Sequence, residues 1–423
     1  MTERAHHDRH SDRIREVCDA LHVPGASGSD RSTIVPTATN GPTLDANHHL
    51  DRLDCPHGAA CGACALLGLG YADQLRRKRE LLGHALGRYE RLRRATLLAC
   101  MPSPMPAGYR IRAKMAVGIS RQREVRVGYF RPGRREIVDA PDCRVLVPEL
   151  LATARLVRRF LAGNREIPRE LRHLDLRCGS DPGHQHLTLV FRSPTCPEFP
   201  VDRLRHACPA INGISVNLNP SAGPQVLRGE IRPLWGEREI WVDCAGLRLR
   251  VSPGSFFQVN LAVLPHIHER IAAFLGRGRV LADLYAGVGT HGLALRERFE
   301  RVFLVEGVRS ATTDLNATIQ RHGIPGAEVV STPVERAVRR LVRRAPDAVI
   351  LNPSRAGAHE SVLEAIAATP ATRIAYLSCE PTTLCRDLDV LERRGFRTRS
   401  VEPIDMMPQT DQVEALVLLD RAG

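Results

Sequence analysis

The pattern of apolar and polar positions changes twice along the 423 residues of the chain. Residues 1–48 are polar and aperiodic, which predicts a disordered tail. Over residues 49–250, short segments of alternating apolar and polar positions predict antiparallel strands, with a helix over residues 148–161. From residue 251 to residue 423, buried-looking strands alternate with helical stretches, which is typical of a mostly parallel sheet covered on both faces. We therefore expect an α/β protein with an antiparallel α+β central region before the C-terminal domain.

Five apolar segments are expected to form the C-terminal sheet. They are residues 280–285, 302–306, 348–351, 374–378 and 415–419. Ligands of such sheets bind outside the carboxyl ends of the strands. The residues that end or follow these segments are therefore the first candidates for a functional site.

A long amphipathic helix is predicted over residues 71–92, and it is rich in cations. Its basic residues and those just after it are Arg76, Arg77, Lys78, Arg79, Arg88, Arg91, Arg93 and Arg94. Over the whole chain, 60 Lys and Arg against 47 Asp and Glu leave a net charge of +13. This surplus favours a polyanionic partner, although the Arg preference of a GC-rich genome explains it equally well.

The sequence argues against membrane insertion and secretion. No apolar run reaches the roughly 18 residues of a membrane span, and no apolar core follows the charged N-terminus as in a secretory signal. We expect a cytoplasmic monomer that does not contact membranes. The 12 cysteines are then expected as thiols rather than disulfides, and their spacing must decide which of them bind metal or react.

A glycine-rich loop follows the first C-terminal strand. Its sequence is DLYAGVGTHG, residues 283–292, in which Gly287 and Gly289 allow tight turns and close approach to a ligand. Glu306 ends the next strand, where a carboxylate can accept hydrogen bonds from ribose hydroxyls. The pattern fits S-adenosylmethionine, but with Gly292 it also spells a dinucleotide fingerprint. The loop alone leaves a methyl donor, NAD and a structural turn as alternatives.

Cys379 is expected at the carboxyl end of a strand, within the sequence YLSCEPTTLCRDL of residues 376–388. A thiolate there is a strong nucleophile, whereas an isolated cysteine is more often a small buried side chain. Three further motifs favour the nucleophile. They are SPGSFFQVN at residues 252–260, ILNPSRAG at residues 350–357 and DMMPQTDQVE at residues 405–414.

With Cys379, these motifs resemble the RNA uridine C5-methyltransferase family, which modifies tRNA and ribosomal RNA. The resemblance extends over roughly residues 50–420 and implies a Rossmann-like class I methyltransferase domain at the C-terminus. It implies S-adenosylmethionine as cofactor and RNA as partner, with 23S rRNA favoured over tRNA. In this family a thiolate adds to carbon 6 of uracil, carbon 5 attacks the methyl group, and a base removes the carbon 5 proton.

The resemblance also assigns roles to individual residues. It implies Cys379 as the nucleophile, Glu414 as the base, and Arg355 as a contact to RNA phosphate or to the pyrimidine. The implied cofactor-binding residues are Gln258, Tyr285, Gly287, Gly289, Thr290, Glu306 and Asn352.

Two positions depart from the family pattern. Asn352 stands where the family has Asp, and Gln412 stands where it has His. Asn keeps the size of Asp but loses its charge, so weaker cofactor or uracil binding, a different nucleic-acid substrate or a loss of activity is a possible consequence. The alternative to an active enzyme is therefore a catalytically silent RNA-binding relative. An NAD-dependent oxidoreductase is the third hypothesis, and it depends on the glycine loop alone.

Three cysteines are clustered in the sequence DCPHGAACGAC, residues 54–64. The spacing of Cys55, Cys61 and Cys64 predicts a metal site, and a tetrahedral set needs a fourth thiolate. Cys143, in a context similar to the family's fourth ligand, is the candidate. The resemblance favours a [4Fe–4S] cluster on these residues, with zinc as the alternative, in a structural or RNA-holding role.

Some relatives begin with a small oligonucleotide-binding β-barrel, which we expect to be absent because residues 1–48 are too polar. RNA is then expected to contact the basic helix after Cys64 and the hairpins near residues 121–135. Such charges supply affinity rather than sequence choice. The target uracil is expected to be flipped into the cleft.

Overall fold

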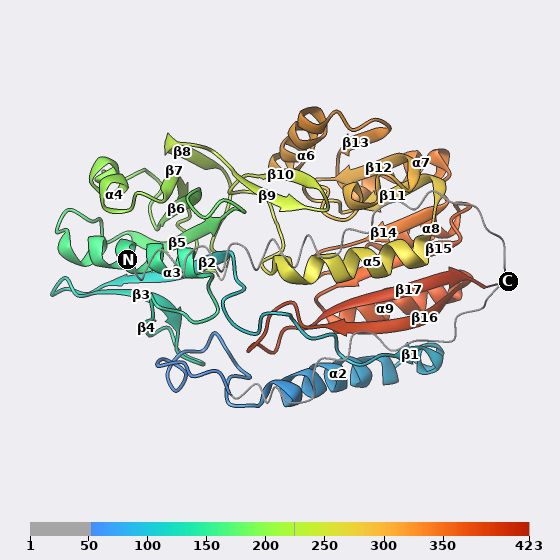
Figure 1. The fold of residues 1–423 in the computed structure, drawn as a ribbon, viewed down its shortest axis with the longest axis horizontal. Coiled ribbons are helices and arrows are strands. Elements are labelled where there is room, and N and C mark those ends of the chain that lie inside the picture. The colour runs from blue at the N-terminus through green and yellow to red at the C-terminus, as the bar shows by residue number, and fades with distance from the viewer. Residues whose placement is uncertain (1–51, 224, 423) are drawn as a thin grey trace, which may run out of the picture.

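The structure is a computed structural model that describes residues 52–223 and 225–422. The expected tail of residues 1–48, and with it the expected absence of a barrel, lies outside the described residues. Figure 1 shows a smaller sheet with its helices on the left and a larger layered sheet on the right. Among the described helices, none combines the length and the apolar character needed to cross a bilayer.

The central sheet contains seven strands in the order β4-β3-β2-β5-β6-β7-β8. The strands are β2 (Arg112–Ile119), β3 (Val125–Phe130), β4 (Ile137–Asp139), β5 (Leu171–Cys178), β6 (Gln185–Phe191), β7 (Ile211–Leu218) and β8 (Ile231–Gly236). Neighbouring strands are antiparallel as predicted, except that β6 and β7 are parallel. This pair corrects the purely antiparallel expectation, because the chain between them crosses over through α4 (Val201–Ala207).

Helix α3 (Pro148–Gly163) covers one face of the central sheet, as the pattern over residues 148–161 predicts. Its buried residues recur at helical spacing, including Leu150 and Val157, and they pack in one core with the strand residue Leu174. The sheet is therefore held from this side by apolar contacts.

The C-terminal sheet contains eight strands in the order β1-β16-β17-β15-β14-β11-β12-β13. The strands are β1 (Thr96–Leu97), β11 (Gly278–Leu284), β12 (Phe299–Glu306), β13 (Ala327–Ser331), β14 (Ala348–Leu351), β15 (Arg373–Ser378), β16 (Phe396–Ile404) and β17 (Glu414–Arg421). All five predicted strands are present, and β17 runs antiparallel to β15 and β16. The pattern missed β16 because Arg397 and Arg399 interrupt its apolar positions.

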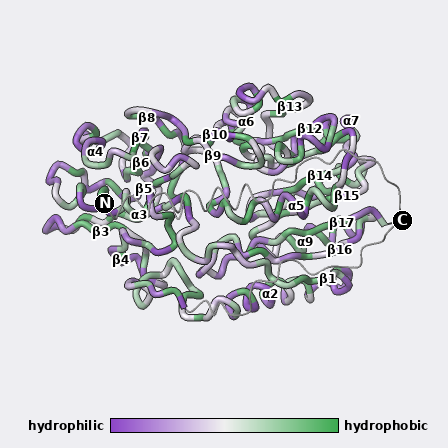
Figure 2. Tube along the Cα trace, viewed as in Figure 1, coloured by the Kyte–Doolittle hydropathy of each residue, from purple (hydrophilic) through white to green (hydrophobic). Residues whose placement is uncertain are grey.

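Helices cover both faces of the C-terminal sheet, which confirms the predicted α/β class. Successive strand residues such as Leu281 and Ala282 belong to two different cores, one on each face. One face packs against α5 (Leu264–Leu275) and α6 (Arg309–His322). The helices on the other face are α2 (Tyr71–Gly87), α7 (Val334–Arg344), α8 (Glu360–Ala367) and α9 (Pro381–Arg393). Figure 2 shows α7 as mostly hydrophilic on the outside of the molecule.

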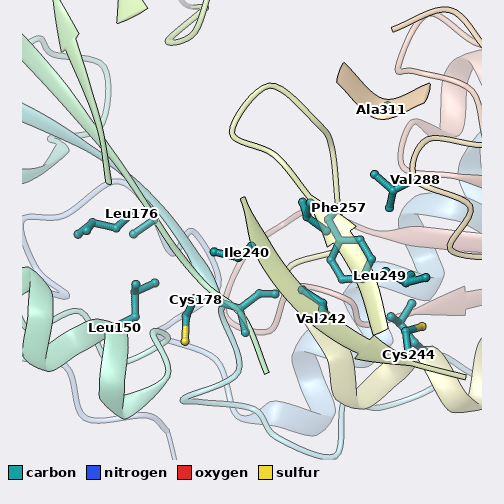
Figure 3. Packing of buried hydrophobic residues seen from close by; sticks show 14 of the residues in the cluster. Leu150, Leu176, Cys178, Ile240, Val242, Cys244, Leu249, Phe257, Val288 and Ala311 are labelled. Carbon is teal, nitrogen blue, oxygen red and sulfur yellow. The ribbon is translucent and has the colours of Figure 1, made fainter. Parts of the chain in front are cut away.

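A two-stranded hairpin, β9 (Ile240–Cys244) and β10 (Leu247–Val251), connects the two sheets. Figure 3 shows Leu176 of the central sheet, Val242 of the hairpin and Val288 of the glycine loop, which belong to one cluster of buried side chains. Because a single apolar core extends through the hairpin, the two sheets are packed against each other through it.

Two segments ahead of residue 250 join the C-terminal sheet. Strand β1 pairs in parallel with β16, with Thr96 opposite Ser400, and α2 packs against α9. The helix predicted over residues 71–92 ends at Gly87 and is followed by a 3₁₀ turn at Glu90–Arg94. The division of the chain at residue 250 stays a prediction, and these contacts place α2 beside the C-terminal domain.

Candidate active site

Four adjacent strands carry candidate site residues at their carboxyl ends. In the order β15, β14, β11, β12, the residues that end or follow each strand are Cys379, Asn352, Tyr285 and Glu306. These strands are parallel neighbours, so the residues lie along one edge of the sheet. The sequence-predicted constellation is therefore brought together at the edge where ligands of open α/β sheets bind.

The glycine loop is held by the carboxylate of Glu306. The backbone N–H of Gly287 donates to Oε2 at 2.8 Å, and the N–H of Val308 donates to Oε1 at 2.7 Å. Gly289 has a φ of +87°, and an added Cβ would come within 2.6 Å of the side chain of Leu315. Glycine is therefore required at residue 289 both by backbone conformation and by space.

Other loop residues are also fixed by local contacts. The hydroxyl of Tyr285 donates to Oε1 of Glu335 at 3.0 Å, and Thr290 is buried. The backbone N–H of Asn352 donates to the carbonyl of Leu284 at 3.3 Å, which ties β14 to the start of the loop. These contacts leave a rigid loop at the edge of the sheet.

Asp283 is a buried acid beneath the loop that the sequence analysis did not single out. It is 1% exposed, and its Oδ2 accepts the N–H of Gly292 at 2.8 Å. Burial, with a smaller contribution from the charge of Glu306, raises the pKa of Asp283 to about 7. Its position at the end of β11, directly before the glycine loop, could have identified it.

The pairing of β15 with β17 places Cys379 beside Glu414. The two strands are antiparallel, and Ser378 lies opposite Ala415. Cys379, which follows Ser378, therefore lies beside Glu414, which precedes Ala415. Burial raises the pKa of Cys379, the charge of Glu414 raises it further, and Arg355 lowers it. Burial raises the pKa of Glu414 to about 8, against a smaller opposing effect of Arg355. The thiol, the carboxyl and the guanidinium therefore form one electrostatic unit.

Arg355 is exposed at the mouth of this group, where its guanidinium donates to Oε1 of Gln412. Its carbonyl accepts the hydroxyl of Thr383 at 3.0 Å, which fixes its backbone against α9. A planar cation in this position can meet either a phosphate or the polar edge of a base.

Gln258 is 7% exposed and lines a small cavity together with Arg112 and Arg177 of the central sheet. Its assignment to the cofactor stays a prediction.

The four cysteines predicted to bind metal line a single cavity. Cys55, Cys61, Cys64 and Cys143 surround it, together with Tyr129. Burial and the neighbouring thiols raise the pKa of Cys64 to about 12. Over residues 52–223 and 225–422, no three His, Cys, Asp or Glu side chains are grouped to hold a single metal ion.

Comparison with known proteins agrees with this geometry. The model of the tRNA (uracil-5-)-methyltransferase family matches residues 237–422. An uncharacterized RNA methyltransferase of Thermosynechococcus vestitus is 32% identical over 379 residues, covering 87% of this chain and 84% of the relative. The chain belongs to the RNA uracil-5-methyltransferase family. A second relative, from Geobacter sulfurreducens, is 31% identical over 384 residues, with 88% of this chain and 77% of the relative covered.

A solved member of the RNA uracil-5-methyltransferase family has the same fold. The Pyrococcus abyssi tRNA (uracil-54, C5)-methyltransferase, in complex with S-adenosyl-L-homocysteine, matches with a TM-score of 0.68 and 25% identity. The match covers 85% of this chain and 86% of that chain. The expected Rossmann-like methyltransferase domain is thereby confirmed.

One cation of the helix predicted to contact RNA lies inside the protein. Lys78 is fully buried, and its Nζ donates to Oδ1 of Asp405 at 2.5 Å, so it is not available to RNA. Gln74 is also buried on the same face of α2. The spacing of Tyr71, Gln74 and Lys78 with the apolar Leu82 could have revealed both as inward-facing.

Proposed function

We propose that the protein methylates carbon 5 of a uridine in RNA, with S-adenosylmethionine as the methyl donor. The observation that carries this proposal is the meeting of Cys379, Glu414 and Arg355 at the sheet edge that also bears the glycine loop. A nucleophile, a base and a cation are the groups that this reaction requires. The S-adenosyl-L-homocysteine in the related Pyrococcus enzyme supports the choice of cofactor over NAD.

S-adenosylmethionine supplies an electrophilic methyl group when it is bound. The residues proposed to hold it are Gln258, Tyr285, Gly287, Gly289, Thr290, Glu306 and Asn352. Glu306 keeps one lone pair on each oxygen after accepting two backbone N–H groups, so it can also accept ribose hydroxyls. Asn352 offers an uncharged amide at its position, which can hydrogen-bond but cannot attract a cation.

The chain's own residues account for the rest of the reaction. The thiolate of Cys379 adds to carbon 6 of the uracil, and the electron pair moves to carbon 5. Carbon 5 then attacks the methyl group, and the electron pair of the broken S–CH3 bond stays on the sulfur of the donor, which leaves as S-adenosylhomocysteine. Glu414 removes the proton from carbon 5, and the electrons of that C–H bond restore the ring double bond as the C6–S bond breaks. Arg355 stabilises both anionic side chains, since its charge lowers the pKa of Cys379 and of Glu414.

The exposed cations on the central sheet are the proposed contacts to the RNA backbone. The loop between β2 and β3 carries Arg121 and Arg123, and the next loop carries Arg134 and Arg135. On α2, Arg76 and Arg77 are exposed as well. We propose 23S rRNA as the first substrate because the four-cysteine set resembles that branch of the family, although the Pyrococcus relative acts on tRNA.

We further propose that Cys55, Cys61, Cys64 and Cys143 bind a [4Fe–4S] cluster. The four cysteine side chains line one cavity, and four thiolates are the usual ligand set of such a cluster, with zinc as the alternative metal. Metal analysis of anaerobically purified protein should give iron and acid-labile sulfide in equal amounts, and both should be lost in Cys143→Ser. Stoichiometric zinc in place of iron would support the alternative metal.

Nucleoside mass spectrometry tests the main proposal. RNA is incubated with anaerobically purified enzyme and labelled S-adenosylmethionine, in separate reactions with ribosomal RNA and tRNA. We expect labelled 5-methyluridine with the wild-type protein, none with Cys379→Ala, and wild-type levels with Cys196→Ala, which alters an exposed cysteine. RNA binding without a methylated nucleoside would instead support a silent RNA-binding relative, as the departures at Asn352 and Gln412 suggest.

A further inference from the structure

The loop of residues 405–413, between β16 and β17, leads directly into Glu414. Four consecutive carbonyl groups of this loop each accept a hydrogen bond from a different part of the chain. The donors are Nδ2 of Asn260 to Met406 at 3.2 Å, Nζ of Lys78 to Met407 at 3.0 Å, the hydroxyl of Tyr109 to Pro408 at 3.0 Å, and the N–H of Leu66 to Gln409 at 2.9 Å. The backbone that precedes the proposed base is thus fixed residue by residue.

Gln409 is the strained point of this loop. Its φ of +72° lies in the left-handed region, which is unfavourable for a residue with a Cβ. Gln74 of α2 compensates by two reciprocal hydrogen bonds: its Nε2 donates to Oε1 of Gln409 at 2.9 Å, and its Oε1 accepts the N–H of Gln409 at 3.0 Å. Both side chains are buried, at 1% and 3% exposure, so these bonds do not compete with water.

Two of the loop's donors belong to the surroundings of the four cysteines. Leu66 is two residues after Cys64. Tyr109 lies in a segment that pairs with the backbone next to Cys143, since the N–H of Gly108 donates to the carbonyl of Arg144 at 3.0 Å. The segments beside the proposed cluster site are therefore connected to the base-bearing loop by hydrogen bonds.

We propose that Gln74 and Tyr109 are positioning residues for the proton-removal step, because they hold loop 405–413 so that Glu414 faces carbon 5. The segment after Cys64 completes the same support through Leu66. The inference rests on the proposed function, in which Glu414 is the base. It predicts that loosening the loop slows proton removal and leaves the earlier addition of Cys379 to carbon 6 intact.

Two variants remove the hydrogen bonds with little change in volume, Gln74→Leu and Tyr109→Phe. In each we expect kcat to fall about tenfold, while kcat/KM for RNA and for S-adenosylmethionine changes less than about twofold, because kcat/KM reports only the steps up to methyl transfer. The covalent Cys379–RNA adduct should accumulate as an SDS-stable band. Deuterium at carbon 5 of the uridine should slow turnover more in these variants than in wild type, because proton removal becomes rate-limiting.

The controls make the same chemical changes away from the loop. Gln320→Leu alters an exposed residue of α6, and Tyr89→Phe alters a half-buried residue beyond α2. Both should keep wild-type kcat, adduct level and isotope effect. Hydrogen exchange gives a second measurement: peptides from residues 405–413 should exchange faster in Gln74→Leu, Tyr109→Phe and Cys64→Ser, with α6 peptides unchanged in protein that stays folded.

The outcomes separate this inference from the proposed function. If wild-type protein forms no 5-methyluridine, the proposed function fails, and the inference fails with it. If wild type is active but the two variants show neither more adduct nor a larger isotope effect, the inference alone is wrong. The rates of all steps could instead fall in proportion to the unfolded fraction, with faster hydrogen exchange throughout the protein. That result would also contradict the inference, because Gln74 and Tyr109 would then have a purely structural role.

Discussion

The guanidinium of Arg355 donates a hydrogen bond to the side-chain oxygen of Gln412. Gln412 is one of the two departures from the family pattern, and this contact gives it a function. It holds an exposed cation beside Cys379 and Glu414, whose pKa values that cation lowers. A neutral amide can accept from arginine at any pH above acid denaturation, whereas a protonated histidine could not. The departure is therefore compatible with an active site.

Removing Arg355 should make the Cys379 thiol less reactive. In Arg355→Met the pKa of Cys379 should rise, because burial and the charge of Glu414 then act without an opposing cation. We expect alkylation of Cys379 by iodoacetamide at pH 8 to be about three- to tenfold slower than in wild type. Peptide mass spectrometry measures the alkylated fraction over time. Gln412→Ala should give a smaller effect, and Arg336→Met on α7 none. Equal rates in Arg355→Met and wild type would contradict the electrostatic link.

The activity should rise with pH through the titration of Glu414. Its pKa is raised to about 8, so at pH 7 most of the free enzyme holds the base in its protonated, inactive form. We expect kcat to increase by up to about tenfold per pH unit below pH 8 and the increase to flatten once Glu414 is deprotonated. A profile that is flat between pH 6.5 and pH 8.5 would argue against Glu414 as the base.

The same shift predicts how stability depends on pH. Between the ordinary pKa of 4.5 and the raised value of about 8, the folded protein keeps a proton on Glu414 that the unfolded chain releases. The free energy of unfolding contributed by this group therefore decreases as pH rises through that window. In Glu414→Gln this decrease should disappear, so the variant should gain stability relative to wild type from pH 5 to pH 8 in urea titrations. A constant difference across that range would show that Glu414 does not titrate there.

The site residues that lie at the ends of apolar strands could be predicted from the sequence. Cys379 and Glu306 were located because apolar strands end at them, and ligand sites of such sheets lie at strand ends. The supports of the site could not be predicted in this way. Gln74 and Gln409 are 335 residues apart in the chain, and Lys78 on the same face of α2 pairs with Asp405, 327 residues away. Their role depends on tertiary packing, which periodicity does not encode.

Gly289→Ala should destabilise the protein more than Gly323→Ala does. Both glycines have positive φ, but an added Cβ at Gly289 meets Leu315 at 2.6 Å, whereas at Gly323 it meets nothing within 4 Å. Gly323→Ala should cost about 1 kcal/mol from backbone strain alone. Gly289→Ala should cost about 3 kcal/mol, because overpacking of the core adds to the strain. Urea denaturation measures both, and equal costs would show that the loop relaxes to accept the methyl group.

Two buried charged residues, Asp314 and Arg177, hold the segment of residues 252–255 that precedes Gln258; we call this pair the clamp. Asp314 of α6 accepts the N–H of Ser252 at 2.7 Å, its hydroxyl at 2.6 Å and the hydroxyl of Ser255 at 2.5 Å. From the other side, Arg177 of the central sheet donates to the carbonyls of Ser252 and Ser255, each at 2.9 Å. Because the carboxylate is fully buried, Asp314→Ala leaves several donors without partners and should cost about 3 kcal/mol.

The clamp variant should also loosen the junction of the two sheets. Hydrogen exchange of residues 252–260 should accelerate in Asp314→Ala, and the KM for RNA should rise because the loop that leads to Gln258 connects the basic sheet to the catalytic domain. Asp202→Ala is the matched control, since that side chain is 80% exposed and forms only a surface ion pair with Arg205. If exchange in the loop stays at the wild-type rate while stability falls, Asp314 supports α6 alone and Arg177 is sufficient to hold the junction.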